Sequence, residues 1–254
     1  MDYILLIVLG GIFGSFANVC IYRLPTRKKI TSGRSYCPKC KKKIAWFDNI
    51  PLISYILLQS KCRKCKKSIN FQYFLVEAVS VFFFVIIYYY FALTVTSLLL
   101  IILSVFLIII FFIDLKHFII PNELTFPMMF LGFVKSFDPN LNTSVFPNFV
   151  NSMIGGILGY LLIWSIIYFY KQIRKREGMG LGDAKLMAVI GFWFGWISIP
   201  FVIFLSSILG LLIVTPSLLN KKRKMTSEIP FGPYIILAAV FYFYFSDQLK
   251  LLLF

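Results

Sequence analysis

Long runs of hydrophobic residues, separated by shorter polar segments, dominate the chain. A run of about 18 or more apolar residues can cross the ~30 Å hydrocarbon core of a bilayer as a helix. The runs predict eight membrane spans, at residues 3–22, 71–91, 95–113, 122–136, 148–170, 186–199, 201–219 and 231–247. The span at 122–136 is the weakest, because it is short and contains Pro127. The pattern predicts an all-α polytopic membrane protein of about eight transmembrane helices, and the 59% hydrophobic content agrees, since soluble domains contain about 45–50%.

The distribution of positive charge predicts the orientation of these spans. The formal net charge of +16 would point to nucleic acid in a soluble protein. If the spans alternate, however, 24 of the 26 Lys and Arg residues fall in loops on one side, at 23–70, 114–121, 171–185 and 220–230. The positive-inside rule places these loops in the cytoplasm. Topology therefore explains the charge, and we expect the lipid bilayer, rather than a nucleic acid, as a partner.

The loop at residues 23–70 is the largest polar region, and it contains four of the five cysteines as "CPKC" and "CRKC". Paired C-x2-C units offer four thiolates to one tetrahedral ion, as in zinc ribbons. Two disulfides or free thiols are the alternatives, and a reducing cytoplasm disfavours the disulfides. Four filled positions make a closed, structural site, so we predict a small zinc-ribbon-like module between the first two spans, with Zn²⁺ bound by Cys37, Cys40, Cys62 and Cys65.

An apolar stretch, "IAWFDNIPLISYILLQ", lies between the two cysteine pairs. It is interrupted by Asp48, Asn49 and Pro51. At this length and composition, an interfacial or re-entrant segment is expected rather than a membrane span.

Two aspartates lie at membrane depth in a chain with only ten acidic residues. Asp114 ends the third predicted span and Asp183 ends the stretch "GMGLGD". The two spans between them return both carboxylates to the cytoplasmic face, where they can meet. Each also has a simpler interpretation, because Asp183 can cap the helix that follows it and Asp114 can pair with Lys116. Together they can divide the work of an aspartic peptidase, in which one carboxylate activates water and the other donates a proton.

The glycines of "GMGLGD" do not match a nucleotide-binding loop. The position of the third glycine in G-x-G-x-x-G is Asp183, and the G-K-[ST] of a P-loop is absent. A flexible backbone beside a carboxylate, able to adopt positive φ and to admit an extended substrate, is the remaining interpretation. We therefore expect substrate to contact Gly178, Gly180, Gly182 and Lys185.

Seven motifs follow one another along the chain: "GSFANVCIYRLP" (14–25), "CPKC" (37–40), "NIPLISY" (49–55), "CRKC" (62–65), "YFLVE" (73–77), "IDLKHFIIPN" (113–122) and "GMGLGDAKL" (178–186). With them the chain closely resembles the type IV prepilin peptidases, also called prepilin leader peptidase/N-methyltransferases. The resemblance implies a GxGD-type intramembrane aspartyl peptidase of the bacterial cytoplasmic membrane, with Asp114 and Asp183 as the catalytic pair. Its substrates would be prepilins or pseudopilins, cut after their short basic leader at the cytoplasmic face.

The resemblance also implies methylation of the new N-terminus with S-adenosylmethionine. This activity would belong to residues 1–92, which include the cysteine loop, and the peptidase to residues 93–254. Glu77 matches a family position and is a candidate for contact with the methyl donor. An ion-coupled transporter with a regulatory zinc module is the alternative function, and a membrane-tethered zinc-ribbon nucleic-acid binder is a weaker one. His117, the one histidine, is expected to be a polar residue at a helix end rather than a catalytic base. The sequence does not indicate an oligomeric state.

Overall fold

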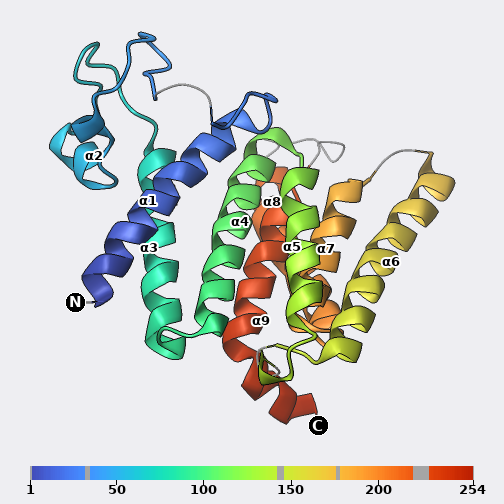
Figure 1. Ribbon diagram of the computed structural model, residues 1–254. Coiled ribbons are helices and arrows are strands. Elements are labelled where there is room, and N and C mark those ends of the chain that lie inside the picture. The colour runs from blue at the N-terminus through green and yellow to red at the C-terminus, as the bar shows by residue number, and fades with distance from the viewer. Residues whose placement is uncertain (1, 32–34, 142–145, 176–177, 220–228, 254) are drawn as a thin grey trace. The chain divides into compact units, whose positions relative to one another are not determined.

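The computed structural model describes residues 2–31, 35–141, 146–175, 178–219 and 229–253, and within them the regular elements are helices (Figure 1). The helices are α1 (Asp2–Arg23), η1 (Trp46–Asn49), α2 (Ile53–Leu57), α3 (Phe71–Phe91), α4 (Val95–His117), α5 (Asn122–Lys135), η2 (Pro139–Leu141), α6 (Phe149–Arg174), α7 (Leu181–Phe194), α8 (Ser198–Leu219) and α9 (Gly232–Leu253). The chain forms two compact units, Met1–Ile109 and Ile110–Phe254, which divide within α4.

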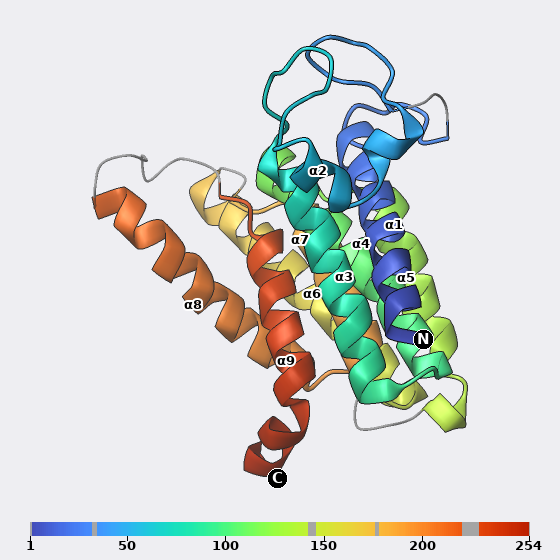
Figure 2. The ribbon, with the colours of Figure 1, turned by 90° about the vertical axis from the view of Figure 1, so that its left-hand side faces the viewer.

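In the first unit, α1 and α3 pack closely along their length (Figure 1). Gly10 and Gly14 of α1 face α3, and a Cβ at Gly14 would lie 2.7 Å from the Cα of Glu77. Small residues four apart let two membrane helices approach in this way. Asn70 caps α3, because its side chain accepts a 2.9 Å hydrogen bond from the Gln72 amide. The residues between α1 and α3 form the cysteine module, and Figure 2 shows α2 lying against this helix pair.

In the second unit, α7 is the most buried element. Its side chains from Ala184 to Ile190 are buried except Lys185, and Trp193 is fully buried. Gly191 of α7 meets Gly155 of α6 so closely that a Cβ on either would overlap the other's backbone. Trp193 donates a 2.8 Å hydrogen bond from Nε1 to the Met128 carbonyl, which ties α7 to α5.

Five helices in the described part of the chain are long and apolar enough to cross a membrane: α1, α3, α4, α6 and, as far as Thr215, α8. The protein is therefore a multi-pass membrane protein with an all-helical fold. Helices α5 and α7 have 14 residues each, about 21 Å at 1.5 Å per residue, which is short of a ~30 Å core. The count of eight spans stays a prediction.

Two predicted boundaries differ from the structure at the residues that matter most. α4 continues to His117, so Asp114 lies in its last turn rather than at its end. α7 begins at Leu181 rather than at 186, so Asp183 lies inside its first turn. Charged residues lower the hydropathy of a sequence window, so the pattern ends a span before the helix itself ends.

Candidate active site

Asp114 is a buried carboxylate at the end of an almost wholly apolar helix. Its residue exposure is 4%, and its backbone carbonyl accepts the Phe118 amide at 3.0 Å. Phe118 has φ +56°, which ends α4 in the way that a left-handed residue commonly ends a helix. Asp114 makes no ion pair with Lys116, which is exposed, so the interpretation of Asp114 as half of an interfacial ion pair is wrong for this structure.

Asp183 is also buried, with 7% exposure, in the first turn of α7. Gly180 is the N-cap of this helix, and the Asp183 amide donates to the Gly180 carbonyl at 3.1 Å. The alternative interpretation, in which the Asp183 side chain caps the helix, is therefore wrong. A carboxylate in the first turn still gains from the positive end of the helix dipole.

The glycines before Asp183 serve close packing rather than an unusual backbone conformation. Gly195 is the one glycine with positive φ among the described residues, so the expected positive φ at Gly178, Gly180 or Gly182 is wrong. A Cβ at Gly178 would lie 2.5 Å from the Tyr170 ring, and one at Gly182 would lie 2.9 Å from Ile120. A Cβ at Gly180 would meet nothing nearer than 3.8 Å. Gly180 therefore borders open space beside Asp183, and its neighbours fix the position of the turn.

The structure brings the two aspartates to one place. Asp183 interacts electrostatically with Asp114. Ile120, which follows α4, packs against Gly182 on one side and against Gly232 on the other, and Gly232 contacts Asp114. Three segments that are far apart in the sequence therefore converge around Ile120.

Gly232 is a site residue that sequence reasoning missed. Its amide donates a buried 3.0 Å hydrogen bond to Oδ2 of Asp114, and a Cβ at this position would lie 2.8 Å from the same oxygen. The signal was present in "PFGPY" (residues 230–234), where a glycine between prolines begins an apolar helix. Proline cannot donate a backbone hydrogen bond, so Gly232 supplies the amide at this helix start.

The Lys185 side chain is hydrogen-bonded to α5 rather than to either aspartate. Its Nζ donates to Oδ1 of Asn122 at 2.7 Å and lies 5.4 Å from the centre of the Phe126 ring. Lys185 therefore connects α7 to α5 beside the aspartates. His117 is exposed at the end of α4.

The four cysteines of the first unit form one cluster, with all four Sγ atoms within 4.8 Å of one another. The Sγ atoms of Cys37 and Cys65 are 3.9 Å apart. A zinc ion with bonds of about 2.3 Å requires thiolates about 3.8 Å apart at tetrahedral corners, so the cluster fits this ion. Hydrogen bonds from the Cys65 and Lys64 amides lower the pKa of the Cys62 thiol to about 7, while the pKa of the neighbouring Cys65 thiol is raised to about 11, because adjacent thiols resist carrying more than one negative charge.

The two halves of the cluster repeat each other in sequence and in backbone. Residues 35–44 and 60–69 share the pattern S-x-C-x-K-C-K-K-x-I. In both, the amide four residues after the first cysteine donates to that cysteine's carbonyl, at 2.8 and 2.9 Å. The donors, Lys41 and Lys66, both have φ +57°. Each half closes with an isolated antiparallel bridge, Tyr36 with Lys43 and Lys61 with Ser68.

Comparisons with known proteins show what the chain is similar to. The family described as "Type IV leader peptidase family" matches residues 101–215, and the "Bacterial Peptidase A24 N-terminal domain" matches residues 8–91. The prepilin leader peptidase/N-methyltransferase of Vibrio cholerae serotype O1 is 36% identical and covers 96% of this chain and 98% of its own length. Proteins of the same name from Xanthomonas campestris pv. campestris and Stutzerimonas stutzeri are 34% and 32% identical, over 95% and 96% of this chain and 90% of each relative. No solved structure matches.

The chain belongs to the type IV leader peptidase family. It is therefore a peptidase, and its similarity extends over both units rather than over one motif. The matched peptidase residues include Asp114 and Asp183 but end before Gly232. The matched N-terminal residues include the cysteine cluster and Glu77.

Glu77 of this leader peptidase is bonded to the protein itself. Its Oε2 accepts the Leu52 amide at 2.7 Å, and Ser15 is a second hydrogen-bonding partner of its side chain. The residue is half-buried against Gly14. These contacts connect α3 to α1 and to the segment before α2.

Proposed function

We propose that this leader peptidase removes the short basic leader of prepilins or pseudopilins at the cytoplasmic membrane face, with Asp114 and Asp183 as its catalytic pair. The proposal rests on one observation above the rest. Two buried carboxylates from α4 and α7 interact, and one of them accepts the Gly232 amide. Ionisable groups at membrane depth are costly, so a pair of them is expected where function requires it.

The arrangement supports a division of labour between the carboxylates. Two adjacent buried negative charges repel each other, so one group keeps its proton. An amide hydrogen bond is stronger to a carboxylate than to a carboxylic acid, so the Gly232 amide favours the charge on Asp114. Asp114 then accepts a proton from a water molecule, and the oxygen of that water attacks the scissile carbonyl carbon. Asp183 gives its proton to the carbonyl oxygen, which forms a tetrahedral diol. As the C–N bond breaks, Asp114 passes the proton that it took from water to the leaving amine, and a hydroxyl of the diol returns a proton to Asp183.

We propose that the leader lies beside Gly178, Gly180 and Lys185. Of the three glycines, Gly180 has the most room beside it, because a Cβ added there would meet nothing nearer than 3.8 Å and would lie 3.9 Å from Oδ2 of Asp183. Gly182 would then act by packing against Ile120 rather than by touching substrate. The orientation toward the cytoplasm rests on the asymmetry of Lys and Arg between the loops.

We further propose that residues 1–92 methylate the new N-terminus and that residues 93–254 are the peptidase part. The names of the relatives support methylation, with S-adenosylmethionine as the methyl donor that would supply the methyl group. Glu77 stays the candidate for contact with the methyl donor. Its side chain is hydrogen-bonded to the Leu52 amide and to Ser15, so these contacts give it no direct part in methyl transfer. Cys37, Cys40, Cys62 and Cys65 would hold Zn²⁺ as a structural ion.

The test is mass spectrometry of a prepilin co-expressed with the protein or with its variants. Asp114→Asn and Asp183→Asn should each leave the leader uncut, and Asp138→Asn, at an exposed turn, should cut normally. The N-terminal mass of the wild-type product reports methylation in the same spectrum. Normal cleavage by Asp183→Asn would refute the aspartyl mechanism. An intact leader with the wild-type protein would instead favour the transporter.

A further inference from the structure

The segment between the cysteine pairs exposes a group of large hydrophobic side chains that no described residue covers. These residues are 38–76% exposed: Trp46, Phe47, Ile50, Ile53, Ile56 and Leu57. Trp46 and Leu57 are the most exposed of them, at 74% and 76%. We call residues 46–58 the apolar hairpin. A contiguous apolar surface of this kind marks an interaction site.

The hairpin is fixed against the membrane helices of its own unit. Pro51 packs on Gly11 of α1, where a Cβ would lie 3.1 Å from the proline ring. The Leu52 amide donates to Glu77 of α3 at 2.7 Å, and Leu52 adopts φ +60° to begin α2. A left-handed leucine is strained, so these contacts hold the chain in a turn that it would otherwise leave.

The position of these contacts along the helices indicates their depth. Gly11 precedes the end of α1 at Arg23 by 12 residues, about 18 Å along the axis, and Glu77 follows the start of α3 at Phe71 by six residues, about 9 Å. One leaflet of the hydrocarbon core is about 15 Å thick. Measured from the start of α3, the Glu77 contact therefore lies within the leaflet that the basic end of α1 enters, and the Gly11 contact, measured along α1 from Arg23, lies near the middle of the bilayer. Ile12 and Phe16 of α1 are also exposed, so α1 itself carries uncovered apolar side chains in this part of the helix.

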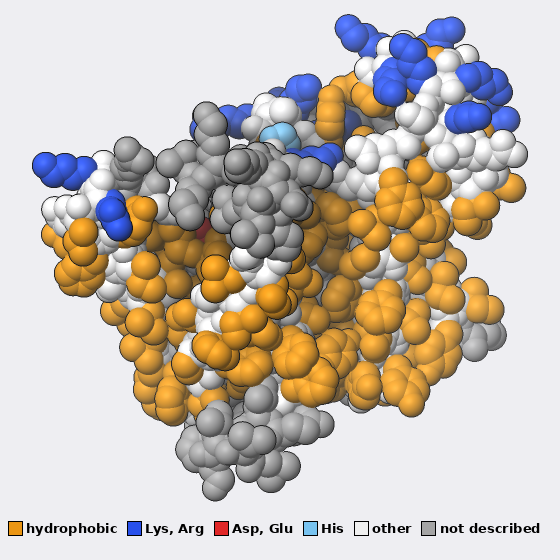
Figure 3. All heavy atoms as spheres, turned by 180° about the vertical axis from the view of Figure 1, so that it is seen from behind, with side chains coloured by type: hydrophobic (Ala, Val, Ile, Leu, Met, Phe, Trp, Pro, Cys, Tyr) orange, Lys and Arg blue, Asp and Glu red, His pale blue; other side chains and the backbone are white. Residues whose placement is uncertain are grey.

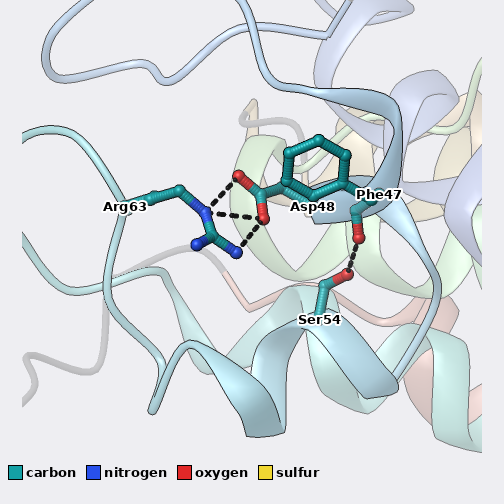
Figure 4. Close-up of polar contacts among 4 residues, drawn as sticks. All are labelled: Phe47, Asp48, Ser54 and Arg63. Carbon is teal, nitrogen blue, oxygen red and sulfur yellow. Dashed lines mark hydrogen bonds and ion pairs between the residues drawn. The ribbon is translucent and has the colours of Figure 1, made fainter.

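The other side of the hairpin is joined to the cysteine module. Arg63, in the second cysteine pair, binds both carboxylate oxygens of Asp48, with its shortest contact at 2.7 Å (Figure 4). Ser54 donates to the Phe47 carbonyl at 2.9 Å, which closes the hairpin on itself (Figure 4). The ion pair fixes the hairpin to the module that bears the positive charge.

The charges around the hairpin suit a phospholipid surface. Nine Lys and Arg residues of the module are exposed: Lys39, Lys41, Lys42, Lys43, Lys61, Arg63, Lys64, Lys66 and Lys67. Asp48, the one acidic residue in residues 35–70, is paired with Arg63. In Figure 3 the Lys and Arg side chains of this unit gather at its end, above a band of hydrophobic side chains (upper right). Basic residues beside an inserted apolar surface are typical of binding to anionic lipids.

We propose that the apolar hairpin is a re-entrant element that inserts into the cytoplasmic leaflet, with its hydrophobic side chains among the acyl chains and the lysines of the module at the level of the lipid phosphates. The hairpin thereby holds the cysteine module against the membrane surface. This role is independent of the proposed peptidase chemistry.

The experiment uses the full-length protein in nanodiscs of phosphatidylcholine and phosphatidylglycerol. The fluorescence of Trp46 is obtained as the difference in tryptophan emission between the wild type and Trp46→Phe. Because Trp46 is exposed, this substitution should leave zinc content and melting temperature unchanged. In nanodiscs made with lipids brominated on the acyl chains, we expect this fluorescence to fall by about half, because an inserted indole contacts the bromines. Quenching of Trp46 by aqueous acrylamide, with no effect of brominated lipid, would overturn the proposal.

A photocrosslinking residue, p-benzoylphenylalanine, distinguishes the other occupants of the surface. Placed at Leu57, it should form adducts with lipid, and placed at exposed Lys64 of the cysteine module it should form fewer acyl-chain adducts. Adducts from position 57 to a second copy of the chain, or to a co-reconstituted prepilin, in place of lipid would assign the surface to that partner and refute insertion.

Discussion

A methyl group at Gly232 should impair the peptidase without unfolding it. In Gly232→Ala the new Cβ would lie 2.8 Å from Oδ2 of Asp114 and 3.1 Å from Cδ1 of Ile120. A carbon and a carboxylate oxygen require a longer separation than this, so the Asp114 side chain must move, and its 3.0 Å hydrogen bond from the Gly232 amide is weakened or lost.

The size of the effect follows from that hydrogen bond. A hydrogen bond to a charged group contributes about 1.5–3 kcal/mol, and each 1.4 kcal/mol changes a rate about tenfold. If the bond is stronger in the transition state, where Asp114 must be correctly oriented, kcat should fall about 10- to 100-fold. KM should change little, because Gly232 is buried beneath the aspartate rather than beside the proposed leader position.

The assay is cleavage of a purified prepilin by the enzyme in detergent or nanodiscs, with kcat and KM measured separately. Gly210→Ala is the matched control, because its Cβ would be in ordinary contact, 3.5 Å from the Tyr234 ring. Both variants should retain a melting temperature close to that of the wild type. Unchanged kcat in Gly232→Ala would show that the amide does not position Asp114, whereas a lost melting transition would show that Gly232 is needed for folding instead.

Three further changes test the packing and the metal site. Lys135→Met should raise the melting temperature, because Nζ of this buried lysine has no hydrogen-bond acceptor among the described residues. Removing an unsatisfied buried polar group gains about 1–3 kcal/mol. The lysine Nζ lies 4.2 Å from the centre of the Phe146 ring, and methionine retains much of this aromatic contact. A lower melting temperature would mean that the cation–π contact outweighs the burial cost. Gly191→Ala should destabilise the second unit by at least about 2 kcal/mol, measured by thermal unfolding against Gly210→Ala, because its Cβ would overlap the Gly155 carbonyl; equal stability of the two variants would contradict the α6–α7 contact. Cys62→Ser should reduce bound zinc, measured by elemental mass spectrometry, while Cys20→Ser should not, because Cys20 lies buried in α1 outside the cluster. Stoichiometric zinc in Cys62→Ser would exclude Cys62 as a ligand.

The hydropathy pattern predicted each long helix in the described part of the chain, because burial in lipid requires apolar residues on all sides of a helix. It could not give the true ends of α4 and α7, since Asp114 and Asp183 lower the local hydropathy where the helix in fact continues. These errors concern the residues with proposed chemistry, where a polar group is retained against the cost of burial.

The cysteine cluster was predictable because its ligands lie close together in the sequence and its geometry follows from their spacing. Gly232 was not predictable, because its contribution is a backbone amide that reaches Asp114 across 118 residues of sequence. Glu77 shows the same difficulty. Its conformity to a motif said nothing about the Leu52 amide that it binds. Contacts made by backbone groups leave little trace in the side-chain pattern.

The repeated halves of the cysteine cluster have a consequence for the entropy of the chain. A metal ion bound to both halves would act as a crosslink across the 21 residues between Cys40 and Cys62, which include the whole apolar hairpin. By analogy with a disulfide, a crosslink that closes a loop of this size lowers the conformational entropy of the unfolded chain and so stabilises the folded state by about 3 kcal/mol. Removing the ion should therefore lower the local stability of residues 46–58 together with that of the cysteine cluster. The supply of metal would then set how often this part of the protein unfolds.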